Sequence, residues 1–312
     1  MTNQYLNREA IKSAHGRIRP FIRRTPLLQL DPAEFCCDAA GLAFKLEYLQ
    51  HAGSFKTRGA FAHLLSAEIP AAGVTAASGG NHGAAVAYAA RHCGMAATIF
   101  VPEIASPAKL DRIRAFGAEL VISGANYAES ATACEAHAKA SGARMIHAYD
   151  QPETIIGQGT MALEIEADAP ETTTIIVAVG GGGLIAGACA WFGHRLKIVA
   201  VEPEHAPTLR RALDARQPID VEVSGIAADS LGARRIGRLA FELASAHVDE
   251  SILVSDEAIR EAQVKLWTEC RIVAEPGGAA ALAALLSGAY QPEAHERVCV
   301  VLCGANTSAL PQ

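Results

Sequence analysis

The chain has 312 residues, half of which are hydrophobic, and it carries a formal net charge of −6. This length and composition can bury the core of two domains or of one large α/β unit. The modest negative charge gives no electrostatic footprint for nucleic-acid binding. Residues 1–14 lack the apolar segment of a signal peptide, and the longest apolar runs are too short to cross a bilayer. We therefore expect a cytoplasmic protein without a membrane or nucleic-acid partner.

Strand-sized apolar runs alternate with longer helical patterns along most of the chain. The expected strands are, in chain order, 75–77, 97–101, 119–122, 144–147, 174–179, 197–201 and 298–302. Helices are expected from about Gly83, from about Pro107, over 127–141 and after the glycines at 180–183. Continuous apolar strands between helices predict parallel sheets that helices cover on both faces. Ligands bind such sheets just beyond the C-terminal ends of the strands, which is where the glycine-rich segments fall.

The segment 73–148 has its own repetition of strands and helices. This predicts a small domain inserted into a larger domain made of residues 1–72 and 149–312. Residues 206–235 carry scattered proline, glycine and aspartate, and we expect them to form a long loop near the site. The eight cysteines have no zinc-ligand spacing and mostly stand among apolar residues, which predicts reduced thiols and no disulfide framework.

The first segment whose residues could take part in catalysis is 53–60, where Lys56 follows Phe55 just before an expected helix. Taken alone, a lysine in such a segment is more often a solvated surface residue. A lysine that forms an imine needs a partly desolvated place, so that its amine can be neutral and nucleophilic. Phe55 would help by excluding water from that place.

Two glycine-rich turns each follow an apolar strand and open a helix. In the turn 78–83, backbone N–H groups and the helix dipole suit an anion such as a substrate carboxylate, although a plain turn explains this segment equally well. Four consecutive glycines at 180–183 lose much entropy on folding, which favours close approach of the backbone to a phosphate. This loop has neither the Gly-Lys-Ser/Thr of a P-loop nor GxGxxG spacing. Cys303 stands at the end of the last expected strand, as a structural or a functional thiol.

Together these segments resemble the serine/threonine dehydratase and serine racemase group of the tryptophan-synthase-β-like, fold type II pyridoxal-phosphate enzymes. The motifs SFKTRGA, SGGNHG, GGGG and CGAN occur in the same order and spacing, and the resemblance runs from Arg24 to Thr307. It implies an α/β fold of two domains, each with a mostly parallel sheet covered by helices. It also implies pyridoxal 5′-phosphate as the cofactor, a small amino acid as the substrate, and a homodimer.

The resemblance implies roles for four side chains around the cofactor. Lys56 would carry the cofactor as an imine, and Phe55 would flank its ring. Asn81 would hydrogen-bond the phenolic oxygen of the ring, and Cys303 would face its pyridine nitrogen. A neutral thiol cannot keep that nitrogen protonated, so the ring would be a weaker electron sink. This favours prompt loss of a β-leaving group over a long-lived carbanion.

The resemblance also implies two anion sites. The cofactor phosphate would be held by the backbone N–H groups of Gly180, Gly181, Gly182, Gly183 and Leu184. The substrate carboxylate would be bound by Ser78, Gly79, Asn81 and His82.

The implied reaction is β-elimination from L-threonine or L-serine, in which Lys56 takes the α-proton, the β-hydroxyl leaves, and a 2-oxo acid and ammonia are released. Serine racemase has a second serine at the position of Gly79, where it acts as a base for the opposite face. The glycine therefore predicts dehydration with weak or no racemisation. Dehydration of hydroxyaspartate or phenylserine stays open, and serine racemisation or β-replacement with sulfide is less favoured. A non-catalytic cofactor or nucleotide binder would explain the four glycines but not Lys56.

Three further features concern metal binding, regulation and the role of Glu275. Relatives bind a divalent cation near a Glu-Pro pair, which matches Glu202 here, and the carbonyl of Ala206 would be a second ligand. Thr208 stands where a third, acidic ligand is expected, which puts the cation site in doubt because hard cations prefer carboxylates. The chain ends soon after the CGAN turn, so the regulatory domain of biosynthetic threonine dehydratases is not expected. Glu275 is either a supporting residue of the site or a helix-start acid.

Overall fold

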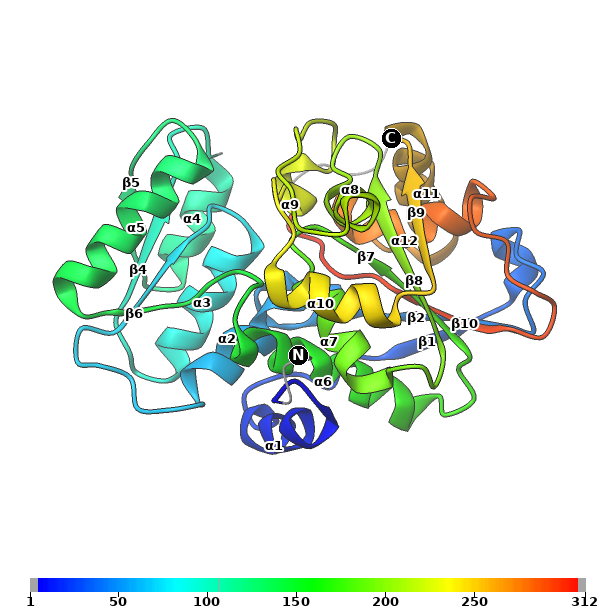
Figure 1. Cartoon of the computed structure of the whole chain (residues 1–312), viewed down its shortest axis with the longest axis horizontal. Coiled ribbons are helices and arrows are strands. Elements are labelled where there is room, and N and C mark those ends of the chain that lie inside the picture. The colour runs from blue at the N-terminus through cyan, green and yellow to red at the C-terminus, as the bar shows by residue number, and fades with distance from the viewer. Residues whose placement is uncertain (1–4, 106, 308–312) are drawn as a thin grey trace.

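The computed structural model describes residues 5–105 and 107–307 and arranges them around two sheets that lie side by side (Figure 1). The larger, six-stranded sheet has the spatial order β1-β2-β10-β7-β8-β9. These strands are β1 (Leu27–Leu30), β2 (Gly41–Lys45), β7 (Thr174–Ala178), β8 (Lys197–Pro203), β9 (Glu250–Val254) and β10 (Arg297–Val301). Neighbouring strands are parallel except for β1 and β2, which are antiparallel.

The smaller, four-stranded sheet has the order β5-β4-β3-β6 and is parallel throughout. Its strands are β3 (Val74–Ala77), β4 (Ala97–Val101), β5 (Glu119–Ile122) and β6 (Arg144–Met145). Each apolar run expected to be a strand is therefore a strand, and the predicted α/β fold with two mostly parallel sheets is confirmed.

Helices surround both sheets, with α3, α4 and α5 grouped around the smaller one (Figure 1). The helices of the first half are α1 (Arg8–Ile18), α2 (Lys56–Leu64), α3 (Asn81–His92), α4 (Pro107–Ala115), α5 (Tyr127–Ser141) and α6 (Pro152–Asp168). Those of the second half are α7 (Gly183–Phe192), α8 (Thr208–Ala215), α9 (Ala228–Leu231), α10 (Arg238–His247), α11 (Asp256–Cys270) and α12 (Pro276–Leu286). Short 3₁₀ turns lie at Pro32–Phe35, Glu47–Leu49 and His51–Gly53. Within the described ranges, no helix is both long enough and apolar enough to span a membrane.

Two main groups of buried apolar residues form the core. In β7 of the larger sheet, Ile175, Ile176 and Val177 are all fully buried, which explains why this strand reads as a continuous apolar run. The core around the smaller sheet also contains Ala60 and Phe61 of α2, which lie outside the segment 73–148. We propose that 73–148 is the small domain and that α2 packs against it.

Two expectations about the elements differ from the structure. The segment 206–235 is not only a loop, since it contains α8 and the short α9. Helix α8 forms because Leu209 and Ala212 bury one face in the core, while a carboxylate from β8 accepts its first N–H groups. The helix expected from Gly83 begins two residues earlier, at Asn81.

Candidate active site

A cavity lies beyond the C-terminal ends of β7 and β10 of the larger sheet, where parallel sheets bind ligands. It is lined by Phe55, Lys56, Asn81, Ala178, Gly180, Gly181, Gly182, Gly183, Leu184, Ser230, Leu231, Glu275 and Cys303. All residues predicted to bind the cofactor are in this set. Of the predicted substrate-binding residues, Asn81 lines the cavity, whereas Ser78, Gly79 and His82 lie in the adjoining turn at the start of α3.

Lys56 is the first residue of α2 and is partly buried in this cavity. Its Nζ donates a hydrogen bond of 2.8 Å to the carbonyl of Ala148 and lies 5.1 Å from the centre of the Phe55 ring. Burial lowers the pKa of Lys56 from 10.5 to about 8, although Cys303 and Glu275 act in the opposite direction. Lys56 is therefore not a solvated surface lysine, and a far larger fraction of its amine is neutral near pH 7 than in an ordinary lysine.

The four-glycine loop, residues 180–183, turns its backbone carbonyls toward donors outside the cavity. The Gly180 oxygen accepts a hydrogen bond of 2.8 Å from Thr208 Oγ1. The Gly181 oxygen accepts one of 3.1 Å from the Gly237 amide, and the Gly182 oxygen accepts one of 2.9 Å from the Ala186 amide. In a trans peptide the following N–H points away from the carbonyl. The amides of Gly181, Gly182 and Gly183 thus face the opposite side, and none of them donates to a described residue.

Steric contacts explain why this loop consists of glycine. A Cβ on Gly181 would lie 2.2 Å from the Tyr149 ring, and Gly182 has a φ of +91°, which side chains disfavour. The loop opens α7 at Gly183, so the positive end of a helix dipole adds to the free amides. Together these features form a cradle for an anion.

Asn81 and Glu275 connect the starts of two helices across the cavity. Asn81 Nδ2 donates to Glu275 Oε1 at 2.5 Å, and Asn306 donates to the other amide atom of Asn81. Glu275 is the N-cap residue of α12, and burial raises its pKa to about 7. Glu275 therefore stands at the start of a helix and also lines the cavity, and a supporting role in the reaction stays a prediction.

Cys303 is buried on the cavity wall, and its Sγ lies 3.3 Å from the carbonyl of Gly277, to which it donates. Burial and the neighbouring Glu275 raise the pKa of this thiol far above its ordinary value of 9.0. The thiol is therefore neutral at physiological pH, as the sequence interpretation assumed. Its position against the pyridine nitrogen stays a prediction.

The ring of His82 is hydrogen-bonded to the protein backbone. Its Nε2 lies 2.9 Å from the carbonyl of Ile146, and burial lowers the pKa of the ring to about 3. Because a carbonyl only accepts, the neutral ring carries its proton on Nε2. A contribution of His82 to substrate binding would come from its backbone N–H at the start of α3, and it stays a prediction.

The residues predicted to hold a divalent cation form hydrogen bonds within their own segment. Glu202 accepts N–H groups from Leu209 at 2.6 Å and from Arg210 at 2.8 Å. The Thr208 hydroxyl lies 3.0 Å from Glu202 Oε1, and the Thr208 amide donates to the Ala206 carbonyl at 3.1 Å. The described residues contain no group of three His, Cys, Asp or Glu that would hold a metal. Since hard cations need several free oxygen ligands, these residues do not fit one.

Residues 18–304 match the family described as "Pyridoxal-phosphate dependent enzyme". The chain belongs to this family of pyridoxal-phosphate dependent enzymes. The catabolic L-threonine dehydratase TdcB of Staphylococcus aureus (strain USA300) is 37% identical over 283 residues, which cover 89% of this chain and 82% of that protein. Phenylserine dehydratase of Ralstonia pickettii is 35% identical over 306 residues, or 96% of this chain and 93% of that protein. The structure of maize serine racemase superposes with a TM-score of 0.91 at 32% identity, covering 97% of this chain and 94% of that one.

The geometry of the cavity fits the cofactor of the family. The cradle at 180–183 has unpaired amides that would suit the phosphate of pyridoxal phosphate, and Lys56 lines the same cavity, where its amine would meet the aldehyde. The family match confirms the cofactor predicted from the sequence, while the roles of the single residues remain predictions.

Sequence reasoning missed several residues that shape the cavity. Tyr149 packs under Gly181, the carbonyl of Ala148 binds Lys56, and Ser230 with Leu231 forms part of the wall. The four glycines were a signal that a bulky group approaches them. The identity of that group depends on contacts between distant segments, which a single sequence does not reveal.

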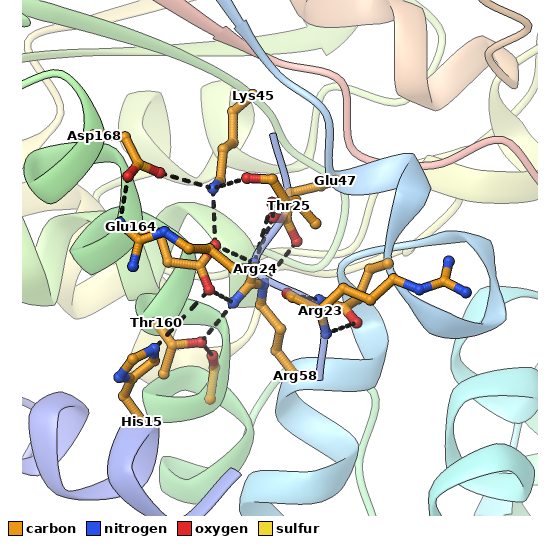
Figure 2. A network of polar contacts seen from close by, with 12 residues as sticks. His15, Arg23, Arg24, Thr25, Lys45, Glu47, Arg58, Thr160, Glu164 and Asp168 are labelled. Carbon is orange, nitrogen blue, oxygen red and sulfur yellow. Dashed lines mark hydrogen bonds and ion pairs between the residues drawn. The ribbon is translucent and has the colours of Figure 1, made fainter. Parts of the chain in front are cut away.

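A buried network of charges, centred on Arg58, supports the helix that carries Lys56 (Figure 2). Arg58 donates to both oxygens of Glu47, at 2.8 and 2.7 Å, and to both oxygens of Glu164, at 2.8 and 2.7 Å. Lys45 donates to Glu164 at 2.8 Å. These four side chains are at most 1% exposed. Two buried cations thus balance two buried anions and join α2 to β2 and α6.

The lowered pKa of Lys56 predicts a pH dependence for the attachment of cofactor to the apoenzyme. The neutral amine is the nucleophile, so its fraction rises with pH, reaches one half at about 8 and levels off roughly one unit higher. We expect the rate of reconstitution, followed by visible absorbance, to reach a plateau above this pH. A rate that keeps rising toward about pH 10 would instead indicate an ordinary lysine.

Proposed function

We propose that this enzyme is an ammonia-lyase that removes water from L-threonine, L-serine or both and releases a 2-oxo acid and ammonia. The observation that carries the proposal is the partly neutral amine of Lys56, which faces an anion cradle and a neutral thiol in one cavity. The similarity to a threonine dehydratase and a phenylserine dehydratase supports dehydration as the reaction.

When bound, pyridoxal phosphate supplies an electron-accepting ring that stabilises negative charge at the α-carbon of the substrate. The backbone N–H groups at the start of α3 orient the substrate carboxylate. Lys56 takes the α-proton on one face of the substrate. Cys303 brings no negative charge to the ring, which favours prompt departure of the β-hydroxyl.

A panel of β-hydroxy amino acids tests this function. The purified holoenzyme is incubated with L-threonine, L-serine, phenylserine and 3-hydroxyaspartate, and 2-oxo acid and ammonia are measured. We expect equal amounts of both products from threonine or serine. No product from any of the four would refute dehydration, and product from phenylserine alone would change the substrate.

A second candidate substrate, 3-hydroxyaspartate, is favoured by Arg112 on α4. Its guanidinium lies next to Gly53, where an added Cβ would be 2.8 Å from it. Its positive charge also acts to lower the pKa of Glu275 in the cavity. Partial burial lowers the pKa of Arg112, and the guanidinium pairs with no described residue. An unpaired, half-buried cation suits an anionic side chain on the substrate. Faster turnover of 3-hydroxyaspartate than of serine would support this candidate.

We expect racemisation of serine to be weak or absent. Gly79 has no side chain to act as a base on the second face, and a Cβ there would lie 3.1 Å from the Cβ of Ala105. Reprotonation from that face therefore lacks a donor at this position. Chiral chromatography of residual L-serine measures the outcome. D-serine formed as fast as pyruvate would show that another group acts as the second base.

We also propose that the enzyme is a homodimer, as its resemblance to the dehydratase group implies, and that it is cytoplasmic. Light scattering coupled to size-exclusion chromatography tests the dimer, and fractionation of the source cells tests the location.

A further inference from the structure

Thr208 lies at the junction between the four-glycine loop and helix α8. Its side chain is fully buried, and its Oγ1 lies 2.8 Å from the carbonyl oxygen of Gly180. Among the described residues, no other group donates to this carbonyl. Removing the hydroxyl would therefore leave the first carbonyl of the loop without a partner.

The rest of the junction fixes the position of Thr208. β7 and β8 are neighbouring parallel strands, so the loop after β7 lies beside Glu202 near the end of β8. Glu202 accepts the amides of Leu209 and Arg210 and thereby holds the first turn of α8. The hydroxyl of Thr208 has one proton, and its Oγ1 lies nearer to the Gly180 oxygen, at 2.8 Å, than to Glu202 Oε1, at 3.0 Å. Glu202 keeps its two amide donors when this proton points at Gly180, whereas Gly180 has no other donor among the described residues.

The carbonyl of Gly180 and the N–H of Gly181 belong to one planar peptide group and point in opposite directions. Fixing the carbonyl on the Thr208 side therefore fixes the N–H on the cavity side. Glycine on both sides of this peptide allows many other orientations, so the restraint has to come from outside the loop.

We propose that Thr208 is a positioning residue for cofactor binding, because its hydroxyl aims the Gly181 amide at the phosphate of pyridoxal phosphate. The amides of Leu209 and Arg210 on Glu202, and the amide of Thr208 on the Ala206 carbonyl, occupy the oxygens that a cation would need at this junction. The inference rests on the cofactor of the family and not on the choice of substrate. Failure of the dehydratase assay therefore leaves it intact.

The test compares two forms of the cofactor that differ only in the phosphate. Full-length enzyme is stripped of cofactor and titrated with pyridoxal phosphate or with pyridoxal, and binding is followed by visible absorbance. For Thr208→Val we expect affinity for pyridoxal phosphate to fall about tenfold, which corresponds to one lost hydrogen bond and an unpaired carbonyl. Affinity for pyridoxal should stay unchanged. Thr208→Ser retains the hydroxyl and should restore the affinity for pyridoxal phosphate.

Thr174→Val is the matched control. Thr174 is also buried in β7, at the opposite end of the strand from the loop, and donates to Glu296 at 2.6 Å. This variant should lower the melting temperature without changing the affinity for either ligand. If Thr208→Val does not fold, Thr208→Ala is a second variant without the hydroxyl and should show the same loss.

Three results would overturn the proposal. One is wild-type affinity for pyridoxal phosphate in the folded variants that lack the hydroxyl. Another is an equal loss of affinity for pyridoxal, which would indicate general damage to the cavity. The third is a loss of cofactor affinity in the wild-type enzyme on chelation that added Mg²⁺ restores, since a cation would then hold the loop. Unchanged affinity in the presence of chelator supports the proposal.

Discussion

Lys56→Ala is expected to lower the rate of 2-oxo acid formation by about a thousandfold, the range typical for loss of a positioned general base. The variant loses both the amine that reacts with the cofactor and the base that takes the α-proton. The measurement is single-turnover product formation with saturating pyridoxal phosphate and the best substrate of the panel. The same enzyme should show no cofactor fixed to the peptide of residue 56 after borohydride reduction and mass spectrometry.

The control for this variant is Lys139→Ala, because Lys139 is exposed on α5. It should retain wild-type activity and wild-type borohydride labelling. Activity of Lys56→Ala within a few-fold of the wild type would show that another group removes the α-proton. The assignment of Lys56 as the base would then be wrong, even if labelling confirmed that it binds the cofactor.

Arg58→Met is expected to lower the free energy of unfolding by about 3–5 kcal/mol, the usual effect of removing one partner from a buried ion pair. The substitution leaves Glu47 and Glu164 in the interior with only Lys45 to balance them. Methionine has a similar shape, so lost charge and hydrogen bonds dominate the effect. Urea unfolding of the apoenzyme, followed by circular dichroism, measures the change.

Arg114→Met is the matched control, because Arg114 forms an exposed ion pair of 3.0 Å with Asp111. No measurable change in stability is expected for this pair. An equally small effect of Arg58→Met would show that its network is solvated in solution.

The network also predicts how stability depends on pH. Burial acts to raise the pKa of Glu164, but the charges and hydrogen bonds of Arg58 and Lys45 outweigh burial and lower it from 4.5 to about 2. A carboxylate with a lowered pKa contributes stability above the unfolded value and loses it as the pH falls through the folded value. Wild-type stability should therefore decline between pH 4.5 and about 2, and Arg58→Met should lose most of this dependence.

The sheets and the cofactor cavity were predictable because their signals are local. Three consecutive fully buried residues in β7, Ile175–Val177, follow from a continuous apolar run. The run of four glycines at 180–183 predicted the anion cradle, because no other role explains it. The motif around Lys56 predicted that this lysine lies in the site. In these cases the residues that carry the information are adjacent in the chain.

Most of the features that the sequence did not predict depend on partners far apart in the chain. Arg58 and Glu164 are separated by 106 positions, so neither shows that it is buried and paired. The interpretation of 206–235 as a loop weighed the local proline and glycine. The missed partner in this case is close in the chain, since Glu202 accepts the first amides of α8 and was interpreted as a cation ligand instead. His82 was assigned from its motif, whereas its ring is occupied by the carbonyl of Ile146.

The position of α2 limits which parts of this enzyme can be exchanged between relatives. The helix contributes Ala60 and Phe61 to the core of the smaller sheet, while Arg58 anchors it to α6. A chimera that replaced residues 73–148 alone would join a foreign sheet to a native α2. The unit that recombination can transfer intact is therefore larger than the inserted segment and includes the helix with the reactive lysine. Chimeric enzymes with a junction before α2 should keep their fold better than those with a junction at residue 73.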